Sequence, residues 1–148
     1  MSETTEGLFR AALGLQEPWF VESVEFDVEK RKLLVHLNFA ASRTFSCGSC
    51  GAERCRSYDT RPPKAWRHLD YLGSETYLMA PTPRVTCHRC EGIRLAELTW
   101  AGPRTRFTWA FELWIAQLAK RMPLKEVAEI VGEPLSRLRR MVLAVGRR

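Results

Sequence analysis

Aspartate is scarce in this sequence. Metal-dependent phosphoryl transfer would require such carboxylate residues. Only Asp27, Asp59 and Asp70 occur among the 148 residues, and no glycine-rich phosphate-binding loop follows an expected strand. Such chemistry needs several carboxylates that hold Mg²⁺ beside the phosphate. We therefore expect no catalytic residues and no enzymatic activity.

The sequence also lacks a long apolar run and an export signal. Its apolar runs stay well below the roughly 18 residues that a membrane span requires, and residues 1–6 are polar and acidic. Five cysteines is an odd number, which fits poorly with a fully paired secreted framework and well with four ligands and a spare in a reducing compartment. We expect a cytoplasmic protein without a membrane partner.

Two pairs of cysteines, each with two residues between them, give the strongest signal in the sequence. Four thiolates at the corners of a tetrahedron satisfy Zn²⁺ completely and leave no position open for water or substrate. The pattern predicts one structural zinc ion, with redox dithiols or disulfides as the alternative. The predicted ligands are Cys47, Cys50, Cys87 and Cys90.

Two further potential ligands lie close to these pairs. Cys55 is the fifth cysteine, and we expect an ordinary free thiol there, with competition for the metal as the alternative. His88 lies inside the second pair, where the flanking cysteines are better placed to bind metal. We expect His36 and His68 to be structural.

Alternating apolar residues predict a β-rich amino-terminal part after a short helix over residues 5–13. Residues 19–28 and 33–39 predict a hairpin with one buried face that includes Phe26 and Val28. Residues 61–63 predict a turn, and a strand over 75–80 is expected to end at Pro81 and Pro83. The apolar stretch over 93–100 is expected to return to the sheet. We expect the tryptophans to be core residues.

A helical period replaces the alternation after residues 101–103. Three short helices are expected, with Gly132 at the turn between the last two and Pro134 at the start of the last. The predicted fold class is α+β: a small β-rich zinc-ribbon-like module over residues 1–102, followed by a three-helix helix-turn-helix domain over residues 103–148.

The spacing within residues 124–141 matches the core of a helix-turn-helix. Ala128 is small where two helices must approach closely, and Gly132 follows it at the bend. Glu133 departs from the pattern, because this position is usually apolar, and we expect Leu135 to fill the space instead. An ordinary helical hairpin in a larger core is the alternative.

Positive charge is concentrated in the last third of the chain. Net charge is +6, and the excess over residues 103–148 attracts polyanions, chiefly nucleic acid. In a helix-turn-helix the last helix enters the major groove, where arginine can bind guanine bidentately. The predicted DNA-facing residues of the last helix are Ser136, Arg137, Arg139 and Arg140; of these, Arg137 and Arg140 are the candidates to bind guanine, and Ser136 can reach a phosphate or a base. The predicted phosphate contacts are Lys120, Arg121, Lys125, Arg147 and Arg148.

Several blocks of sequence together resemble the N-terminal part of ISL-three family transposases. The resemblance extends from about residue 7 to residue 142. The blocks that carry it are residues 8–15, 19–21, 47–51, 66–70, 83–87 and 122–128, and the Trp-Arg-His-Leu-Asp block at 66–70 is the most specific.

This resemblance implies a zinc-binding domain and a helix-turn-helix that recognise the terminal inverted repeats of a mobile element. It implies that Cys47, Cys50, Cys87 and Cys90 bind zinc and that the helix over residues 135–145 reads DNA. In that family a catalytic domain with an RNase-H-like fold follows, and none of its carboxylates has a counterpart here. We expect a bacterial, nucleoid-associated protein.

Double-stranded DNA is thus the expected partner, and a transposase or a second copy of the chain is a further candidate. The chain would be the recognition part of a transposase or a stand-alone repressor or competitor. One alternative is a zinc-stapled module that binds or inhibits another protein. A weaker one is RNA binding through exposed aromatic side chains.

Overall fold

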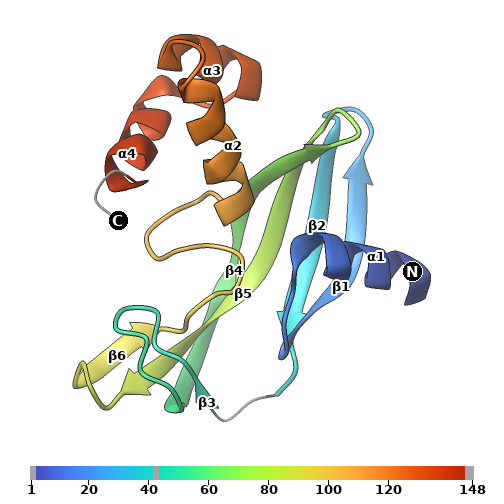
Figure 1. The fold of residues 1–148 in the computed structure, drawn as a ribbon. Helices are drawn as coiled ribbons and strands as arrows, with labels where there is room; N and C mark the ends of the chain where they lie inside the picture. The colour runs from blue at the N-terminus through green and yellow to red at the C-terminus, as the bar shows by residue number, and fades with distance from the viewer. Residues whose placement is uncertain (1–2, 42–43, 146–148) are drawn as a thin grey trace. The chain divides into compact units, whose positions relative to one another are not determined.

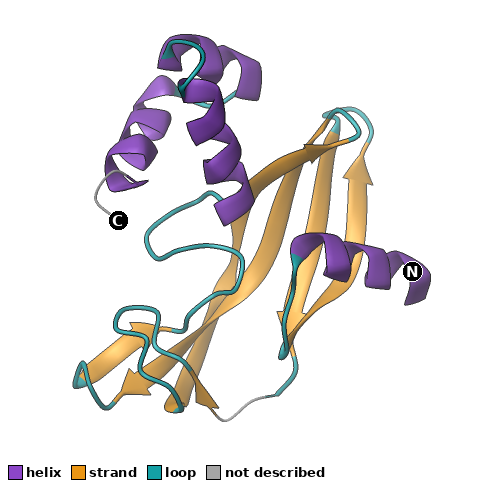
Figure 2. Cartoon of the chain, viewed as in Figure 1, coloured by secondary structure: helices purple, strands orange, loops and turns teal. Residues whose placement is uncertain are grey.

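The structure of this chain is a computed structural model that describes residues 3–41 and 44–145. It contains two compact units, the first ending at Thr108 and the second beginning at Trp109 (Figure 1). Strands occur in the first unit, and the second is built from helices (Figure 2). This agrees with the predicted α+β class. The expected domain boundary at residue 102 stays a prediction, because a division into compact units does not show that each unit folds on its own.

One six-stranded sheet organises the first unit, with β2 and β5 parallel and the other neighbours antiparallel. Its strand order is β1-β2-β5-β4-β3, and β6 pairs with β5 as well. The elements are α1 (Glu3–Leu13), β1 (Trp19–Asp27), β2 (Lys32–Phe39), β3 (Thr44–Phe45), β4 (Cys55–Tyr71), β5 (Ser74–Cys87) and β6 (Gly92–Leu95).

The long strand β5 contributes to two hydrophobic cores from opposite faces. Leu78 and Ala80 belong to a core with Trp19, Trp66 and Trp100. Val85 and Cys87 belong to a second core that contains the cysteines. Side chains an odd number of residues apart point to opposite faces of a strand, so β5 buries one face and then the other. Trp19, Trp66 and Trp100 are core residues, as predicted, whereas the prediction is wrong for Trp109, which is 41% exposed.

The prolines do not interrupt these strands, which corrects two predictions. Residues 61–63 lie inside β4 rather than in a turn, and a register shift between Arg61 and Lys64 accommodates Pro62 and Pro63. Pro81 and Pro83 lie inside β5. On one side, β5 pairs with β2 over residues 75–79 and with β6 over residues 84–87. Between these stretches, no strand of the described residues pairs with that side of β5, so a proline there removes no hydrogen bond between strands.

The predicted hairpin is present as β1 and β2, but its buried face is shorter than expected. Leu33, Val35 and Leu37 are buried along β2. The register shift between Val21 and Ser23 keeps Val24 and Phe26 on the face of Val21, opposite Val35 and Leu33, yet Phe26 and Val28 are 50% and 72% exposed. The turn end of the hairpin is uncovered, which alternation alone cannot reveal.

The second unit contains the three predicted helices: α2 (Trp109–Ala119), α3 (Leu124–Val131) and α4 (Leu135–Val145). Its buried side chains include Ile115, Val127, Val131 and Leu138. Gly132 ends α3 with a φ of 72°, and its N–H donates to the carbonyl of Ala128 at 2.9 Å. A left-handed residue at this place stops one helix and allows the next to start at once. Pro134 immediately precedes α4, where its missing N–H costs nothing.

Candidate metal centre and nucleic-acid interface

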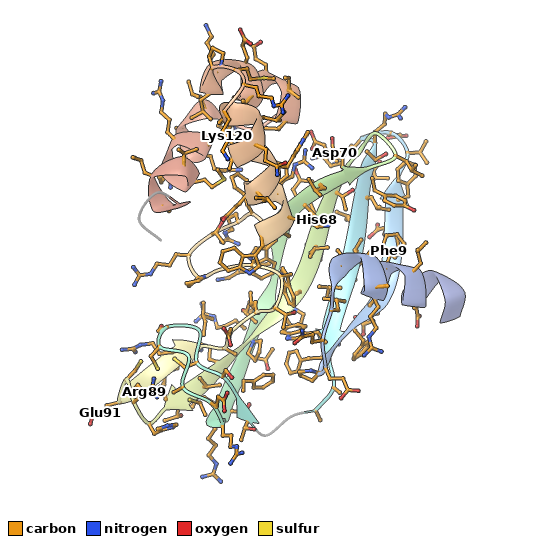
Figure 3. All side chains as sticks on the ribbon, in the orientation of Figure 1. Phe9, His68, Asp70, Arg89, Glu91 and Lys120 are labelled. Carbon is orange, nitrogen blue, oxygen red and sulfur yellow. The ribbon has the colours of Figure 1, made fainter. Side chains whose placement is uncertain are left out.

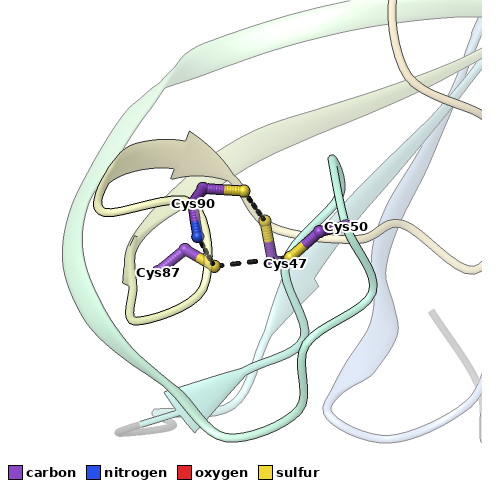
Figure 4. A group of neighbouring side chains, drawn as sticks. All are labelled: Cys47, Cys50, Cys87 and Cys90. Atoms are coloured by element: carbon purple, nitrogen blue, oxygen red, sulfur yellow. Dashed lines mark hydrogen bonds between the residues drawn. The ribbon is translucent and has the colours of Figure 1, made fainter.

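The four predicted zinc ligands converge from two turns (Figure 4). The sulfur atoms of Cys47, Cys50, Cys87 and Cys90 all lie within 4.8 Å of one another. Sγ of Cys50 is 3.5 Å from Sγ of Cys87, and Sγ of Cys47 is 4.0 Å from Sγ of Cys90. Zn–S bonds of about 2.3 Å in a tetrahedron place sulfurs about 3.8 Å apart. The group therefore has the size and donor set of a tetrahedral zinc site.

Backbone hydrogen bonds fix both turns around these sulfurs. In the first turn, the N–H of Gly51 donates to the carbonyl of Cys47 at 2.9 Å, and Gly51 has a φ of 76°. The N–H of Ser49 points at Sγ of Cys47 at 3.4 Å. In the second turn, the N–H of Cys90 donates to Sγ of Cys87 at 3.2 Å. Such N–H groups stabilise thiolates, which are the metal-binding form of cysteine.

The thiol pKa values differ strongly within the four-sulfur group. The N–H of Cys90 lowers the pKa of Cys87 to about 6. The neighbouring sulfur of Cys50, together with burial, raises the pKa of Cys90 to about 12. One thiolate is thus favoured and another opposed, because negative charges at this distance repel. A divalent cation among the four sulfurs removes the conflict.

The first turn also packs against the end of β6 and the residues that follow it. This contact was not predicted from the sequence. The N–H of Gly48 donates to the carbonyl of Leu95 at 2.9 Å, and the N–H of Glu97 donates to the carbonyl of Ser46 at 2.8 Å. A Cβ at residue 48 would lie 2.8 Å from the oxygen of Leu95. The glycine in the first cysteine pair is therefore needed for a close approach of two backbones.

Cys55 lies outside the four-sulfur group. Its buried thiol donates to the carbonyl of Ala52 at 3.3 Å, and burial raises its pKa. Nδ1 of His88 is 3.9 Å from this sulfur. These contacts support the predicted roles of both residues as spare donors.

The other histidines have structural partners. Nε2 of His36 is 3.1 Å from a carboxylate oxygen of Glu25. Nδ1 of His68 is 2.8 Å from Oγ1 of Thr108. Burial, helped by the charge of Arg67, lowers the pKa of His68 to about 4.

Helix α4 presents a polar, basic surface away from its buried side. Leu138 and Met141 are buried. At about 100° per residue, Ser136 lies on the opposite side, flanked by Arg139 and Arg140. All three of these side chains are exposed.

Leu143 belongs to the same surface and was missed by sequence reasoning. It follows Ser136 by two helical turns and is 63% exposed. An exposed apolar side chain on this face could contact a thymine methyl group in a major groove. A helical wheel of α4 would have found it, because Leu143 falls on the same side of the wheel as Ser136.

Arg137 lies at the margin of this surface and is held by Glu133. Nη1 of Arg137 donates to Oε2 of Glu133 at 2.9 Å. The Arg137 side chain is 51% exposed, whereas that of Glu133 is 6% exposed. The expectation that Leu135 replaces Glu133 in the core is therefore wrong: the carboxylate itself is buried and pairs with the arginine one turn later.

The predicted phosphate-contacting residues are placed as follows. Lys120 is exposed after the end of α2 (Figure 3). Arg121 is exposed next to it, and Lys125 is exposed in the first turn of α3. Arg147 and Arg148 lie outside the described residues.

Two family models match this chain. One, for the helix-turn-helix domain of transposase family ISL3, matches residues 96–146. The other, for the zinc-finger of transposase IS204/IS1001/IS1096/IS1165, matches residues 43–90. The chain carries the zinc finger and helix-turn-helix of ISL-three family transposases. The resemblance predicted from sequence is confirmed.

Individual transposases agree with this assignment. The chain is 29% identical over 129 residues to the transposase for insertion sequence element IS1557 of Mycobacterium tuberculosis, covering 84% of this chain. It is 30% identical over 118 residues to the transposase for insertion sequence element IS1001 of Bordetella parapertussis, covering 79% of this chain. The chain spans 29% of the length of each of these relatives. No solved structure matches it.

These matches identify what the chain contains. It has a zinc-finger region with four clustered cysteines and a helix-turn-helix typical of DNA binding. None of the described helices is long and apolar enough to cross a membrane. The predicted lack of enzymatic activity stays a prediction, since the matched region is only part of each relative.

Proposed function

We propose that this chain binds double-stranded DNA in a sequence-specific manner, at the terminal inverted repeats of a mobile element. It would act as the DNA-recognition part of an ISL-three transposase. The observation that carries the proposal is the exposed surface of α4, which combines Ser136, Arg139 and Arg140 on a helix-turn-helix. A recognition helix of this kind enters the major groove with its N-terminal residues nearest the bases.

The proposed DNA contacts are of two kinds, contacts to base edges and contacts to phosphates. Ser136, Arg137, Arg139 and Arg140 would face base edges, where each good arginine–guanine pair contributes about 1–3 kcal/mol of discrimination. The residues that would neutralise phosphates, giving affinity without sequence preference, are Lys120, Arg121, Lys125, Arg147 and Arg148. We propose residues 103–148 as the DNA-binding domain.

In this proposal the metal is structural. Cys47, Cys50, Cys87 and Cys90 would hold one Zn²⁺, which stabilises the turns at the end of β5 and before β4. Four sulfur ligands leave no open coordination position, so the ion would supply folding energy rather than chemistry. As part of a full-length transposase, this region would position the element end; alone, it would occupy that end as a repressor or competitor.

The salt dependence of binding tests this proposal against a protein-binding module. We would measure Kd for a mixed-sequence duplex by fluorescence anisotropy between about 50 and 300 mM salt. DNA binding through several cations gives a steep log–log slope of about −0.9 per phosphate contact. Lys120→Gln/Lys125→Gln should flatten that slope, whereas the matched control Arg10→Gln/Lys30→Gln should not. No salt-dependent binding by the wild type would contradict the proposal.

A further inference from the structure

Charge is unevenly distributed within the zinc-finger unit. Residues 3–39, which form α1 and the β1–β2 hairpin, contain seven carboxylates and four cations, a net charge of −3. Residues 53–64 and 84–94 contain seven cations and three carboxylates, a net charge of +4. We refer to these two segments, from β4, β5, β6 and their turns, as the basic ribbon. A polyanion would be attracted to the basic ribbon and repelled by the hairpin.

The basic ribbon exposes its cations along β4. Every residue from Arg56 to Pro63 is exposed, so this stretch is uncovered on both faces of the strand. Arg56 and Arg61 lie within it, Arg94 is exposed on β6, and Arg89 is exposed in the turn before β6 (Figure 3).

The carboxylates of the basic ribbon only partly offset this charge. Asp59 accepts two hydrogen bonds from Arg84, one of them from Nε at 2.7 Å, and these bonds lower the pKa of Asp59. The guanidinium of Arg84 also lies 5.5 Å from the ring centroid of Tyr58. Asp59 is therefore paired with Arg84. It is the only carboxylate among the ion pairs of the ribbon that the structure describes.

The free edge of β4 is poorly suited to a peptide partner. β3 pairs with β4 at Cys55 and Arg56, and among residues 3–41 and 44–145 no strand pairs with the following stretch of that edge up to Pro63. Pro62 and Pro63 lie in this stretch, and prolines on an edge strand block the addition of another strand. Binding there would have to use side chains, and the exposed charged side chains are mostly cationic.

The predicted metal site lies at the base of the basic ribbon. β5 ends at Cys87, and β6 starts two residues after Cys90. Cys55, the first residue of β4, pairs with Phe45, two residues before Cys47. The turns that hold the metal ligands thus hold the ends of these strands, and metal binding would fix the ribbon's cations in place.

We propose that the basic ribbon is a second DNA-contacting surface, which binds the sugar-phosphate backbone of duplex DNA through Arg56 and Arg61. Arg56 pairs with Thr86 and Arg61 with Thr82, so the register shift between Ser57 and Asp59 leaves both arginines on one face of the strand. Their partners in β5 are four residues apart, a span of about 13 Å, comparable to the axial rise of about four successive phosphates on one strand. The contacts add affinity without reading sequence. This inference rests on the proposed function, but it assigns contacts to the zinc-finger unit in addition to α4.

The test compares Arg56→Gln/Arg61→Gln with the wild type over the same salt range, on a mixed duplex and on a preferred duplex. The variant's log–log slope should be shallower by about 2, and its affinity should fall roughly tenfold or more on both duplexes, since each contact contributes a slope of about 0.9. Arg56→Lys/Arg61→Lys should restore both values. Arg10→Gln/Lys30→Gln, which removes two cations from the acidic end, should match the wild type.

Zinc content and melting temperature should be unchanged in all variants, because each mutated side chain is exposed. A ribbon variant with wild-type slope and affinity would overturn the inference, while the Lys120→Gln/Lys125→Gln variant still tests the proposed function separately. A loss confined to the preferred duplex would also overturn a backbone role. If the wild type shows no salt-dependent binding, both proposals fail.

Discussion

Glu133 is the residue at which this helix-turn-helix departs most clearly from the usual pattern. Its buried carboxylate holds one side of Arg137, which limits the positions that the guanidinium can adopt. An arginine fixed by a carboxylate keeps its remaining N–H donors in a defined direction, and less entropy is lost when it binds a base. Arg137 would then be a base-reading arginine positioned by Glu133.

This proposal predicts a change in specificity rather than in overall affinity. Glu133→Gln should lower the preference for guanine at one position of the bound site by about tenfold, within the range expected for one arginine–guanine contact. Binding of a mixed duplex should change little. The measurement is competition between duplexes that differ at single positions. Equal losses at all positions would indicate a general change in α4 instead.

The buried His68 should make the free energy of unfolding depend on pH. Its folded-state pKa is lowered to about 4 because burial, aided by Arg67, disfavours the charged ring. Between pH 6.5 and about 4 the unfolded chain binds a proton that the folded chain does not. Stability from this residue is therefore full above pH 6.5 and is lost as pH falls, by up to roughly 3 kcal/mol.

Urea unfolding of the wild type and His68→Gln at several pH values tests this prediction. The variant should show a flatter decline over the same window. Metal release at low pH would affect both proteins equally, so it cancels in the comparison. Parallel curves would show that another group accounts for the decline.

Gly48 is the residue where a single methyl group should be most damaging to the first cysteine turn. Because a Cβ there would lie 2.8 Å from the oxygen of Leu95, we expect Gly48→Ala to displace the turn and lower the melting temperature. Gly7→Ala is the matched control, since a Cβ at residue 7 meets nothing within 4 Å. Similar melting temperatures for the two variants would contradict the close approach.

At the scale of elements, the two cysteine turns should depend on metal for their structure. Metal binding at such sites is coupled to folding, so chelation or Cys50→Ser should cost several kcal/mol and at least about 10 °C in melting temperature. Cys55→Ser, whose sulfur lies outside the four-sulfur group, should retain the metal. Elemental analysis should find one zinc per chain. A metal-free, reduced sample with unchanged melting would contradict a structural zinc.

The elements that sequence predicted best are those whose pattern is local. The helical period of α3 and α4 and the glycine between them identify the helix-turn-helix, and the alternation in β2 identifies its buried face. The cysteine spacing alone selected the four side chains that the structure brings together. In each case neighbouring residues contain the information.

What sequence could not reveal depends on distant partners. Pro81 and Pro83 remain in β5 because its neighbours on one side change from β2 to β6 at that point. The docking of Gly48 on Leu95 and the pairing of Glu133 with Arg137 likewise require the folded arrangement. Phe26 lies opposite the buried Leu33 and is nevertheless exposed, because the turn end of the hairpin is uncovered. These features are set by pairing across the fold rather than by propensity.

At the scale of the whole molecule, we propose that this chain recognises a DNA sequence. Its two units offer different chemistry: α4 for reading bases, and the basic ribbon for binding phosphates. Specific recognition would need the first, and affinity would draw on both. The net charge of +6 alone would give only non-specific binding.

The measurement that tests this claim most directly is selection of bound duplexes from a randomised DNA library, at about 150 mM salt with zinc present, followed by sequencing. The account predicts enrichment of one motif that contains guanines, and loss of guanine preference in Arg137→Ala or Arg140→Ala. Recovery of unenriched DNA by a folded, zinc-loaded protein would contradict it.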